Sequence, residues 1–146
     1  MNKFSIRIMP DKLKLYKCSR DEYKNIISKY NLYNVDDILA QTFLEDEITI
    51  YYLIKNISGG STENQYIHHI LSKICTSDNR SYTVINIYED IPGIDHIGII
   101  NKISNLFLVQ NIPILYINTY GHNIVLVADE YIDNAITILN KIGNIE

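Results

Sequence analysis

The chain has 146 residues, of which 47% are hydrophobic and 21% charged, with a formal net charge of −4. This length suits one ordinary domain or two very small ones, and the composition is that of a folded globular protein. No basic segment favours nucleic-acid binding, no apolar run approaches the roughly 18 residues that span a membrane, and the N-terminal residues do not have the pattern of a signal peptide. We therefore expect a cytoplasmic protein without nucleic-acid or membrane partners.

The two cysteines, Cys18 and Cys75, are too few for a disulfide framework and lack the spacing of metal ligands. We expect both to be reduced thiols. His68 and His69 are adjacent, which is not the i, i+4 spacing of a zinc pair on a helix. The sequence therefore predicts no metal site.

The first 30 residues predict two strands and a helix. Phe4–Met9 and Leu13–Cys18 alternate apolar and polar residues, as half-buried strands do, and Pro10-Asp11 between them predicts a turn. Ser19 to Glu22 has the form of a capping box, in which the serine hydroxyl and the glutamate carboxylate each bind the other residue's backbone amide. The helix that follows has its apolar side chains at helical spacing, namely Tyr23, Ile26, Ile27 and Tyr30.

The next segment predicts a hairpin and a second helix. Ile38–Leu44 and Glu47–Ile54 are strands joined by the acidic turn Glu45-Asp46. Ser58-Gly59-Gly60-Ser61 has the most flexible composition of the chain and is a candidate linker or insertion point. A helix is expected over Asn64–Cys75.

The second half of the chain repeats this order. Ser81–Asp90 predicts a strand, and Asp95 is a candidate N-cap for a helix. Ile112–Tyr120 and Asn123–Ala128 predict a hairpin around Gly121-His122. The helix that follows Asp95 has the predicted core positions Ile97, Ile100, Ile103 and Phe107. A last helix is expected after its cap Asp129 and ends at Gly143. Its apolar face consists of Ile132, Ala135, Ile136 and Leu139.

Each half thus has the order βαββα, so the predicted fold class is α+β with two ferredoxin-like units. We expect an N-terminal unit at residues 1–78, with an insertion at about 58–79, and a C-terminal unit at 79–146. A ferredoxin-like unit ends with a fourth strand, and the second half predicts none. We therefore hypothesise that Phe4–Met9 crosses over and completes the sheet of the C-terminal unit.

Three stretches carry a resemblance to a known family: Gln41–Tyr52, the Gly98-Ile99 pair that opens a helix, and the strand–turn–strand segment from Asn111 onward. In this order the chain resembles ACT domains, and more narrowly the tandem-ACT proteins related to the CASTOR-type cytosolic arginine sensors and their short bacterial relatives. The resemblance implies a regulatory module without catalytic activity or cofactor, which binds an amino acid or similar small ligand. It also implies a homodimer through the C-terminal units, and a protein partner that responds to the ligand.

By position, the resemblance implies ligand-binding roles for Asp95, Ile97, Gly98, Ile99, Thr119, Tyr120, Gly121 and Asn123. One of these departs from the pattern, because the arginine sensors have an aspartate where this chain has Asn123. An amide cannot supply the negative charge that holds a cationic group. The departure favours a neutral amino acid, another ligand or no ligand.

Simpler explanations exist for the same residues. Gly98 lies where free helix amides attract an anion, but a glycine there also permits tight packing. The residues around Gly121-His122 are also ordinary turn residues, His122 suits an exposed turn, and Asp95 suits an N-cap. The acidic clusters Glu45–Glu47 and Glu89-Asp90 could do acid–base work or hold Mg²⁺. Carboxylates at strand ends and turns are, however, usually solvated. Two other hypotheses therefore stay open: a ligand-free interaction module, and a small enzyme on a ferredoxin-like fold.

Overall fold

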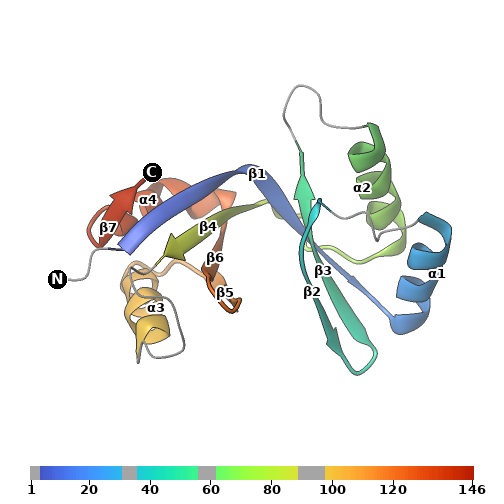
Figure 1. Cartoon of the computed structure of the whole chain (residues 1–146), viewed down its shortest axis with the longest axis horizontal. Helices are drawn as coiled ribbons and strands as arrows, with labels where there is room; N and C mark the ends of the chain where they lie inside the picture. Colours follow the sequence, from blue (N-terminus) through green and yellow to red (C-terminus); the bar gives the residue numbers. More distant parts are fainter. Residues whose placement is uncertain (1–3, 31–35, 56–61, 89–97) are drawn as a thin grey trace. The chain divides into compact units, whose positions relative to one another are not determined.

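The computed structural model describes residues 4–30, 36–55, 62–88 and 98–146, and these fold into two compact units (Figure 1). Unit 1 comprises Met1–Pro10 and Tyr82–Glu146, and unit 2 comprises Asp11–Ser81. The candidate linker Ser58 to Ser61 lies outside the described residues. No helix in the described ranges is long and apolar enough to cross a membrane.

The first strand, β1 (Phe4–Cys18), belongs to both units. The predicted turn at Pro10-Asp11 is therefore wrong, because the two predicted strands form one continuous strand of 15 residues. Pro10 lies between the part of β1 that pairs with the last strand and the part that pairs within unit 2. A proline, which lacks an N–H donor, is tolerated in a strand where no ladder bond needs that donor.

Unit 1 is a sheet covered on one face by two helices, in the order that a ferredoxin-like fold requires (Figure 1). Its strands lie in the order β1-β4-β6-β5, with β7 paired to β1. The N-terminal strand thus completes the sheet of the C-terminal half, as hypothesised, and the α+β, ferredoxin-like prediction is confirmed. The strands are β4 (Tyr82–Tyr88), β5 (Ile114–Asn118), β6 (Asn123–Ala128) and β7 (Gly143–Ile145).

The short strand β7 corrects two expectations, that the second half has no fourth strand and that Gly143 only ends a helix. It runs parallel to β1, with Gly143 opposite Phe4 and Ile145 opposite Ile6. The Phe4 amide donates to the Ile142 carbonyl at 3.3 Å, and the Glu146 amide donates to the Ile6 carbonyl at 2.8 Å. A Cβ atom on Gly143 would lie 2.0 Å from the Phe4 carbonyl oxygen, so only glycine allows this approach.

The helices of unit 1 begin later than predicted. α3 (Ile99–Val109) has Gly98 as its N-cap residue instead of Asp95, which lies outside the described residues. A 3-10 turn (Asp129–Tyr131) precedes α4 (Ile132–Leu139), whose N-cap residue is Tyr131. Asp129 is therefore not its N-cap; the Asp129 carboxylate instead accepts a hydrogen bond from the Thr83 hydroxyl at 2.9 Å.

The core of unit 1 lies between the sheet and the two helices. α3 contributes Ile103 and Phe107, both fully buried, with Ile99 packed beside them. Ile100, which was predicted to be in the core, is 48% exposed because the helix presents the face of Ile99 to the sheet. The fully or nearly fully buried side chains of this core are Ile6, Ile85, Ile87, Ile103, Phe107, Ile112, Val125, Val127, Ala135, Ile138 and Leu139.

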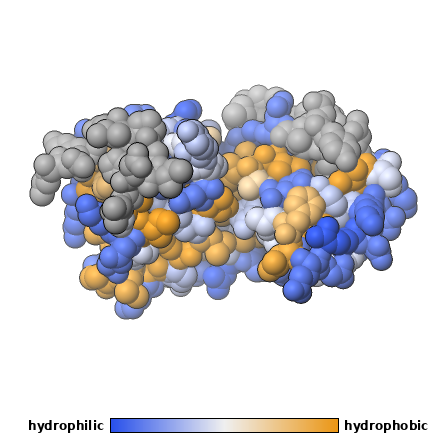
Figure 2. Space-filling view, turned by 60° about the horizontal axis from the view of Figure 1, so that its bottom comes forward, coloured by the Kyte–Doolittle hydropathy of each residue, from blue (hydrophilic) through white to orange (hydrophobic). Residues whose placement is uncertain are grey.

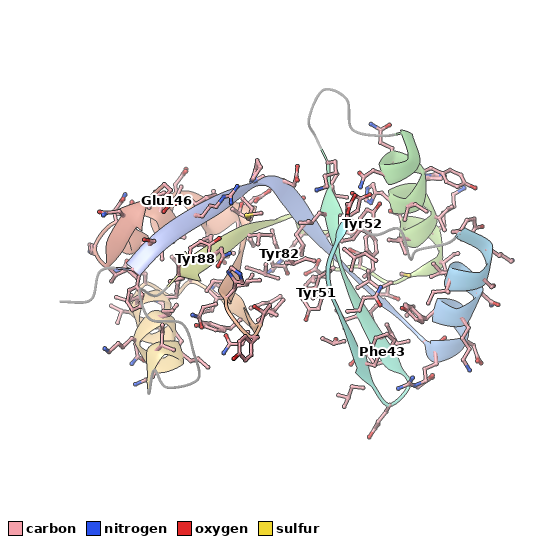
Figure 3. All side chains as sticks on the ribbon, in the orientation of Figure 1. Phe43, Tyr51, Tyr52, Tyr82, Tyr88 and Glu146 are labelled. Carbon is pink, nitrogen blue, oxygen red and sulfur yellow. The ribbon has the colours of Figure 1, made fainter. Side chains whose placement is uncertain are left out.

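Unit 2 has the strand order β2-β3-β1 with two helices, α1 (Arg20–Tyr30) and α2 (Thr62–Ile74). Its hairpin joins β2 (Ile38–Leu44) to β3 (Glu47–Ile54) through the predicted acidic turn, so the hairpin prediction is confirmed. Side chains alternate along β3: Figure 3 shows Tyr51 and Tyr52 on opposite sides, with Tyr52 toward α2. The core residues are Tyr16, Cys18, Ile26, Ile48, Ile50, Tyr52, Ile67, Leu71 and Cys75.

The capping box at the start of α1 is confirmed. The Glu22 amide donates to the Ser19 hydroxyl at 3.1 Å, and the Ser19 amide donates to the Glu22 carboxylate at 2.9 Å. These two bonds satisfy backbone donors that a helix start leaves free. They fix where α1 begins and therefore which of its side chains face the hairpin.

Candidate functional site

The start of α3 is an exposed backbone turn formed by Gly98. Its φ is 84° and its ψ 8°, a left-handed conformation that strains other residues. Among the described residues no heavy atom lies within 4 Å of a Cβ built on Gly98. Tight packing therefore does not explain this glycine, whereas its backbone angle does. No N-cap side chain bonds the first-turn amides of α3, which leaves donors of the kind that bind anions.

The second candidate element is the tip of the β5–β6 hairpin, residues 119–122. The Thr119 amide donates to the His122 carbonyl at 3.0 Å and closes the loop. Thr119 and Gly121 are exposed, and Tyr120 is 95% exposed. Gly121 does not have a positive φ, so the left-handed freedom of glycine is not what this turn uses.

Asn123 is the first residue of β6 and is partly buried. Val125 and Val127 of the same strand belong to the core beneath the helices. Because side chains alternate along a strand, Asn123 lies on this helix-covered face. Its Oδ1 accepts a hydrogen bond from the Tyr116 hydroxyl at 3.0 Å, and its Nδ2 donates to the Ile87 carbonyl at 3.5 Å.

These two bonds give a local reason for an amide at this position. A carboxylate could accept from Tyr116, but it could not donate to the Ile87 carbonyl. It would instead place negative charge against that oxygen. Asn123 therefore makes a bond to the Ile87 carbonyl that an aspartate at this position could not make.

His122, which comes directly before Asn123 in the chain, lies on the other face of the sheet. Its Nδ1 lies 3.1 Å from Asn86 Nδ2, and its ring packs edge-on against Tyr88 with centroids 5.1 Å apart. The side chain thus takes part in contacts of the sheet and does not extend freely from the turn. The predicted polar turn is divided between two faces, with Asn123 on one and His122 on the other.

Of the predicted site residues, Ile99 and Asn123 lie on the helix-covered side of the sheet. Ile99 packs against the core that contains Ile87 and Val125, and Asn123 lies opposite Ile87 in the sheet. Thr119, Tyr120 and Gly121 extend from the hairpin tip, away from this core. Asp95 and Ile97 lie outside the described residues.

The acidic and histidine clusters have structural contacts where the structure describes them. Asp46 accepts from the Arg20 amide at 3.1 Å, and Glu47 lies 3.5 Å from the Lys17 ammonium. His68 Nδ1 lies 2.5 Å from the buried Tyr16 hydroxyl, within hydrogen-bond distance. Within the described ranges, no three side chains of His, Cys, Asp or Glu gather as metal ligands would. Glu89-Asp90 lies outside those ranges.

Sequence reasoning missed one feature, a cavity of about 320 Å³ in unit 2 between α1 and the β2–β3 hairpin. The available signal was the helical spacing of Arg20 and Lys24 beside Tyr23 and Ile27. That spacing predicts a shared helix face, but it does not reveal that Phe43 of the hairpin closes the other side.

One family model matches part of the second half of the chain. Residues 79–141 match the sequence model of the family described as ACT domain. No curated protein matches the chain.

Solved structures match nearly the whole chain at low sequence identity. A Vibrio cholerae protein of unknown function, described as a possible transport protein, has 11% identity and a TM-score of 0.66 over 97% of this chain and 91% of its own. The ligand-free regulatory subunit of aspartate kinase from Thermus thermophilus has 8% identity and a TM-score of 0.63 over 95% and 97%.

Aspartate kinase from Clostridium acetobutylicum has 15% identity and a TM-score of 0.63 over 92% of this chain, which spans only 33% of that enzyme. At these identities the likeness is one of fold.

Proposed function

We propose that this chain is a non-catalytic regulatory module that binds an amino acid or similar small ligand in unit 1. The proposal rests on two features of unit 1: the start of α3 at Gly98, which has no side-chain cap bond, and the partly buried carboxamide of Asn123 on the helix-covered face of the sheet. The ACT match over residues 79–141 and the regulatory subunit among the structural relatives support it.

The chemistry of the two elements suits a zwitterion. The α3 amides and the positive end of the helix dipole favour a carboxylate. The Asn123 Oδ1, which now accepts from Tyr116, is an acceptor of the kind that an α-ammonium group needs. Because Asn123 carries no charge, a neutral side chain on the ligand is favoured over that of arginine. By position, Asp95, Ile97 and Ile99 would complete the α3 side of the site.

A homodimer through the C-terminal units would give the hairpin tip its role. Thr119, Tyr120 and Gly121 extend from unit 1, so they are placed to reach a second copy. Ligand binding at such an interface would stabilise one arrangement of the pair, and a protein partner would distinguish the two states by linkage. In this proposal the chain works as a sensor built from two ACT-type units.

The alternative is an interaction module of the same fold that has no ligand. The observation that favours it is that both ends of the Asn123 carboxamide already have protein partners, Tyr116 and the Ile87 carbonyl. A ligand would have to replace at least one of these bonds.

Thermal unfolding with each of the twenty amino acids at millimolar concentration tests the proposal. A ligand at 100 times its Kd adds about 2.7 kcal/mol of stability, which raises the Tm by several degrees for a chain of this size. We expect a shift with one or a few neutral amino acids and loss of that shift in Asn123→Ala. Asn134→Ala is the matched control, since Asn134 is an exposed residue of α4 and belongs neither to the proposed site nor to the hairpin tip. No shift with any amino acid would favour the interaction module.

A further inference from the structure

The cavity in unit 2 lies within one compact unit and is separate from the proposed site in unit 1. One wall is a face of α1, and the other is the β2–β3 hairpin, whose lower end Figure 3 marks with Phe43. In Figure 2, hydrophobic and hydrophilic side chains lie next to one another at the lower right, where this unit is seen. The lining residues are Arg20, Tyr23, Lys24, Ile27, Ser28, Phe43 and Ile48.

The floor and one side of this cavity are apolar. Ile48 is 1% exposed and closes the bottom. Tyr23 and Phe43 meet edge to face, with ring centroids 5.3 Å apart and planes at 86°. The Tyr23 hydroxyl donates to Gln41 Oε1 at 2.6 Å, which fixes its ring. Phe43 is 50% exposed, so it offers an aromatic surface that the unit itself leaves uncovered.

The rim of the cavity is cationic. Arg20 and Lys24 are four residues apart and therefore share a face of α1. The Arg20 Nε donates to the Glu45 carbonyl, which holds the guanidinium at the hairpin end of the cavity. Three acids lie near these cations in the chain or in space: Asp21 and Glu22 stand between them in the sequence and do not line the cavity, and the Asp46 carboxylate accepts from the Arg20 backbone amide. None of the residues that line the cavity is acidic.

We propose that this cavity binds a small carboxylate with an apolar, preferably aromatic, body. A volume of about 320 Å³ is at the small end of ligand sites. The guanidinium of Arg20 can hold a carboxylate through two parallel hydrogen bonds, and Lys24 adds a second charge. The ring of the ligand packs on Phe43 and Ile27, where burial of apolar area favours binding.

The same lining selects against amino acids. An α-ammonium group would enter between two cations and would find no lining carboxylate to pair with. The ligand class is therefore a net anion without an amine, such as an aromatic 2-oxo acid or an aryl carboxylate. This distinguishes the unit 2 cavity from the zwitterion site proposed in unit 1.

Titration of the ¹⁵N-labelled full chain with phenylpyruvate, followed by NMR, tests the assignment. We expect saturable shifts confined to α1 and the β2–β3 hairpin. Phenylalanine, which differs mainly by its ammonium group, should bind at least tenfold more weakly, and phenylacetamide, which lacks the negative charge, should do the same. Shifts elsewhere, or equal binding of the three compounds, would overturn the proposal.

Variants on the exposed surface keep the test independent of folding. Lys24→Gln and Arg20→Gln should each weaken phenylpyruvate binding roughly tenfold or more, since each removes a charge-assisted contact. Phe43→Ala should weaken it by removing the aromatic wall. Lys29→Gln is the matched control, because Lys29 is on the same helix and does not line the cavity. Undiminished binding in both charge variants would refute the site, and Asn123→Ala should leave it unchanged whether or not unit 1 binds an amino acid.

Discussion

Lys17 and Thr76 exchange both of their backbone hydrogen bonds, at 2.8 and 2.9 Å, in an antiparallel bridge. Cys18 follows Lys17 and Cys75 precedes Thr76, and the two thiols are side-chain hydrogen-bond neighbours. Both thiols are free and buried in the core of unit 2.

The first prediction concerns the reactivity of this thiol pair. Burial raises the pKa of both thiols, that of Cys75 to about 12, so neither is a thiolate at neutral pH. We expect no reaction with an aromatic disulfide reagent at pH 7.5 while the chain is folded, and two thiols per chain in denaturant. Rapid labelling of the folded chain would contradict this placement.

The second prediction is a loss of stability at alkaline pH. In the unfolded chain Cys75 ionises at its ordinary pKa near 8.5, whereas in the folded chain it stays protonated up to about 12. The unfolded state therefore holds fewer protons in this window, and the free energy of unfolding falls as the pH rises from about 9 to 12. One proton corresponds to about 1.4 kcal/mol per pH unit. Chemical denaturation at several pH values should show a shallower slope for Cys75→Ala than for the unchanged chain.

The third prediction concerns His68 and acid pH. Burial, Lys14 and His69 lower the pKa of His68 from its ordinary 6.5, and its Nδ1 lies 2.5 Å from the Tyr16 hydroxyl. The unfolded chain takes up this proton first, so stability present above pH 6.5 is lost as the pH falls toward the lower pKa. NMR titration should place the His68 pKa below 6.5, and His68→Gln should weaken the pH dependence of the Tm between 7 and 5. A pKa above 6.5 would contradict this partly buried setting of the ring.

The fourth prediction concerns Gly143 and the pairing of β7 with β1. Gly143→Ala places a methyl group 2.0 Å from the Phe4 carbonyl oxygen, so the strands must separate. We expect a loss of about 1–3 kcal/mol, as for other overpacked sites. Gly121→Ala, where nothing lies within 4 Å, should change the free energy of unfolding by far less. Equal effects of the two changes in urea denaturation would argue against the close approach.

The fifth prediction concerns Asn123. Asn123→Asp removes the donor to the Ile87 carbonyl and places a carboxylate beside it, so we expect a loss of about 1–3 kcal/mol at neutral pH. The loss should shrink at pH 4, where the new carboxyl group is partly protonated. Urea denaturation at both pH values measures this difference, and a stabilising effect at neutral pH would show that the amide contact is unimportant.

Local signals allowed most of the fold to be predicted. The capping box of Ser19 and Glu22, the alternation in β3 and β6, and the acidic hairpin turn depend on neighbours within a few residues, so the sequence displays them. The crossover of the first strand was inferred because the predicted element order of the second half lacked a fourth strand, and the structure has both the crossover and the short strand β7. These are arguments from period and topology, which do not need atomic contacts.

What was missed depends on contacts between distant residues. Pro10-Asp11 has the composition of a turn, and only the pairing of β1 on both sides shows that the strand continues. β7 has three residues, too few for a period, and its glycine is explained only by Phe4. Asp95 is a good cap by residue type, but the positive φ of Gly98 sets where α3 starts. The hydrogen-bond partners of Asn123, Tyr116 and the Ile87 carbonyl, depend on the register of the strands, which cannot be derived from the sequence.

The shared strand β1 has a consequence for how the chain acquires its structure. Its residues Phe4 to Pro10 have their partners of unit 1 in residues 82–146, so unit 2 lies between the two segments in the sequence. Unit 2 can close from a continuous segment, whereas unit 1 needs both segments. Contacts of such long sequence separation slow folding. Phe4 to Pro10 are thus expected to pair late, and unit 2 can form while they are still unpaired.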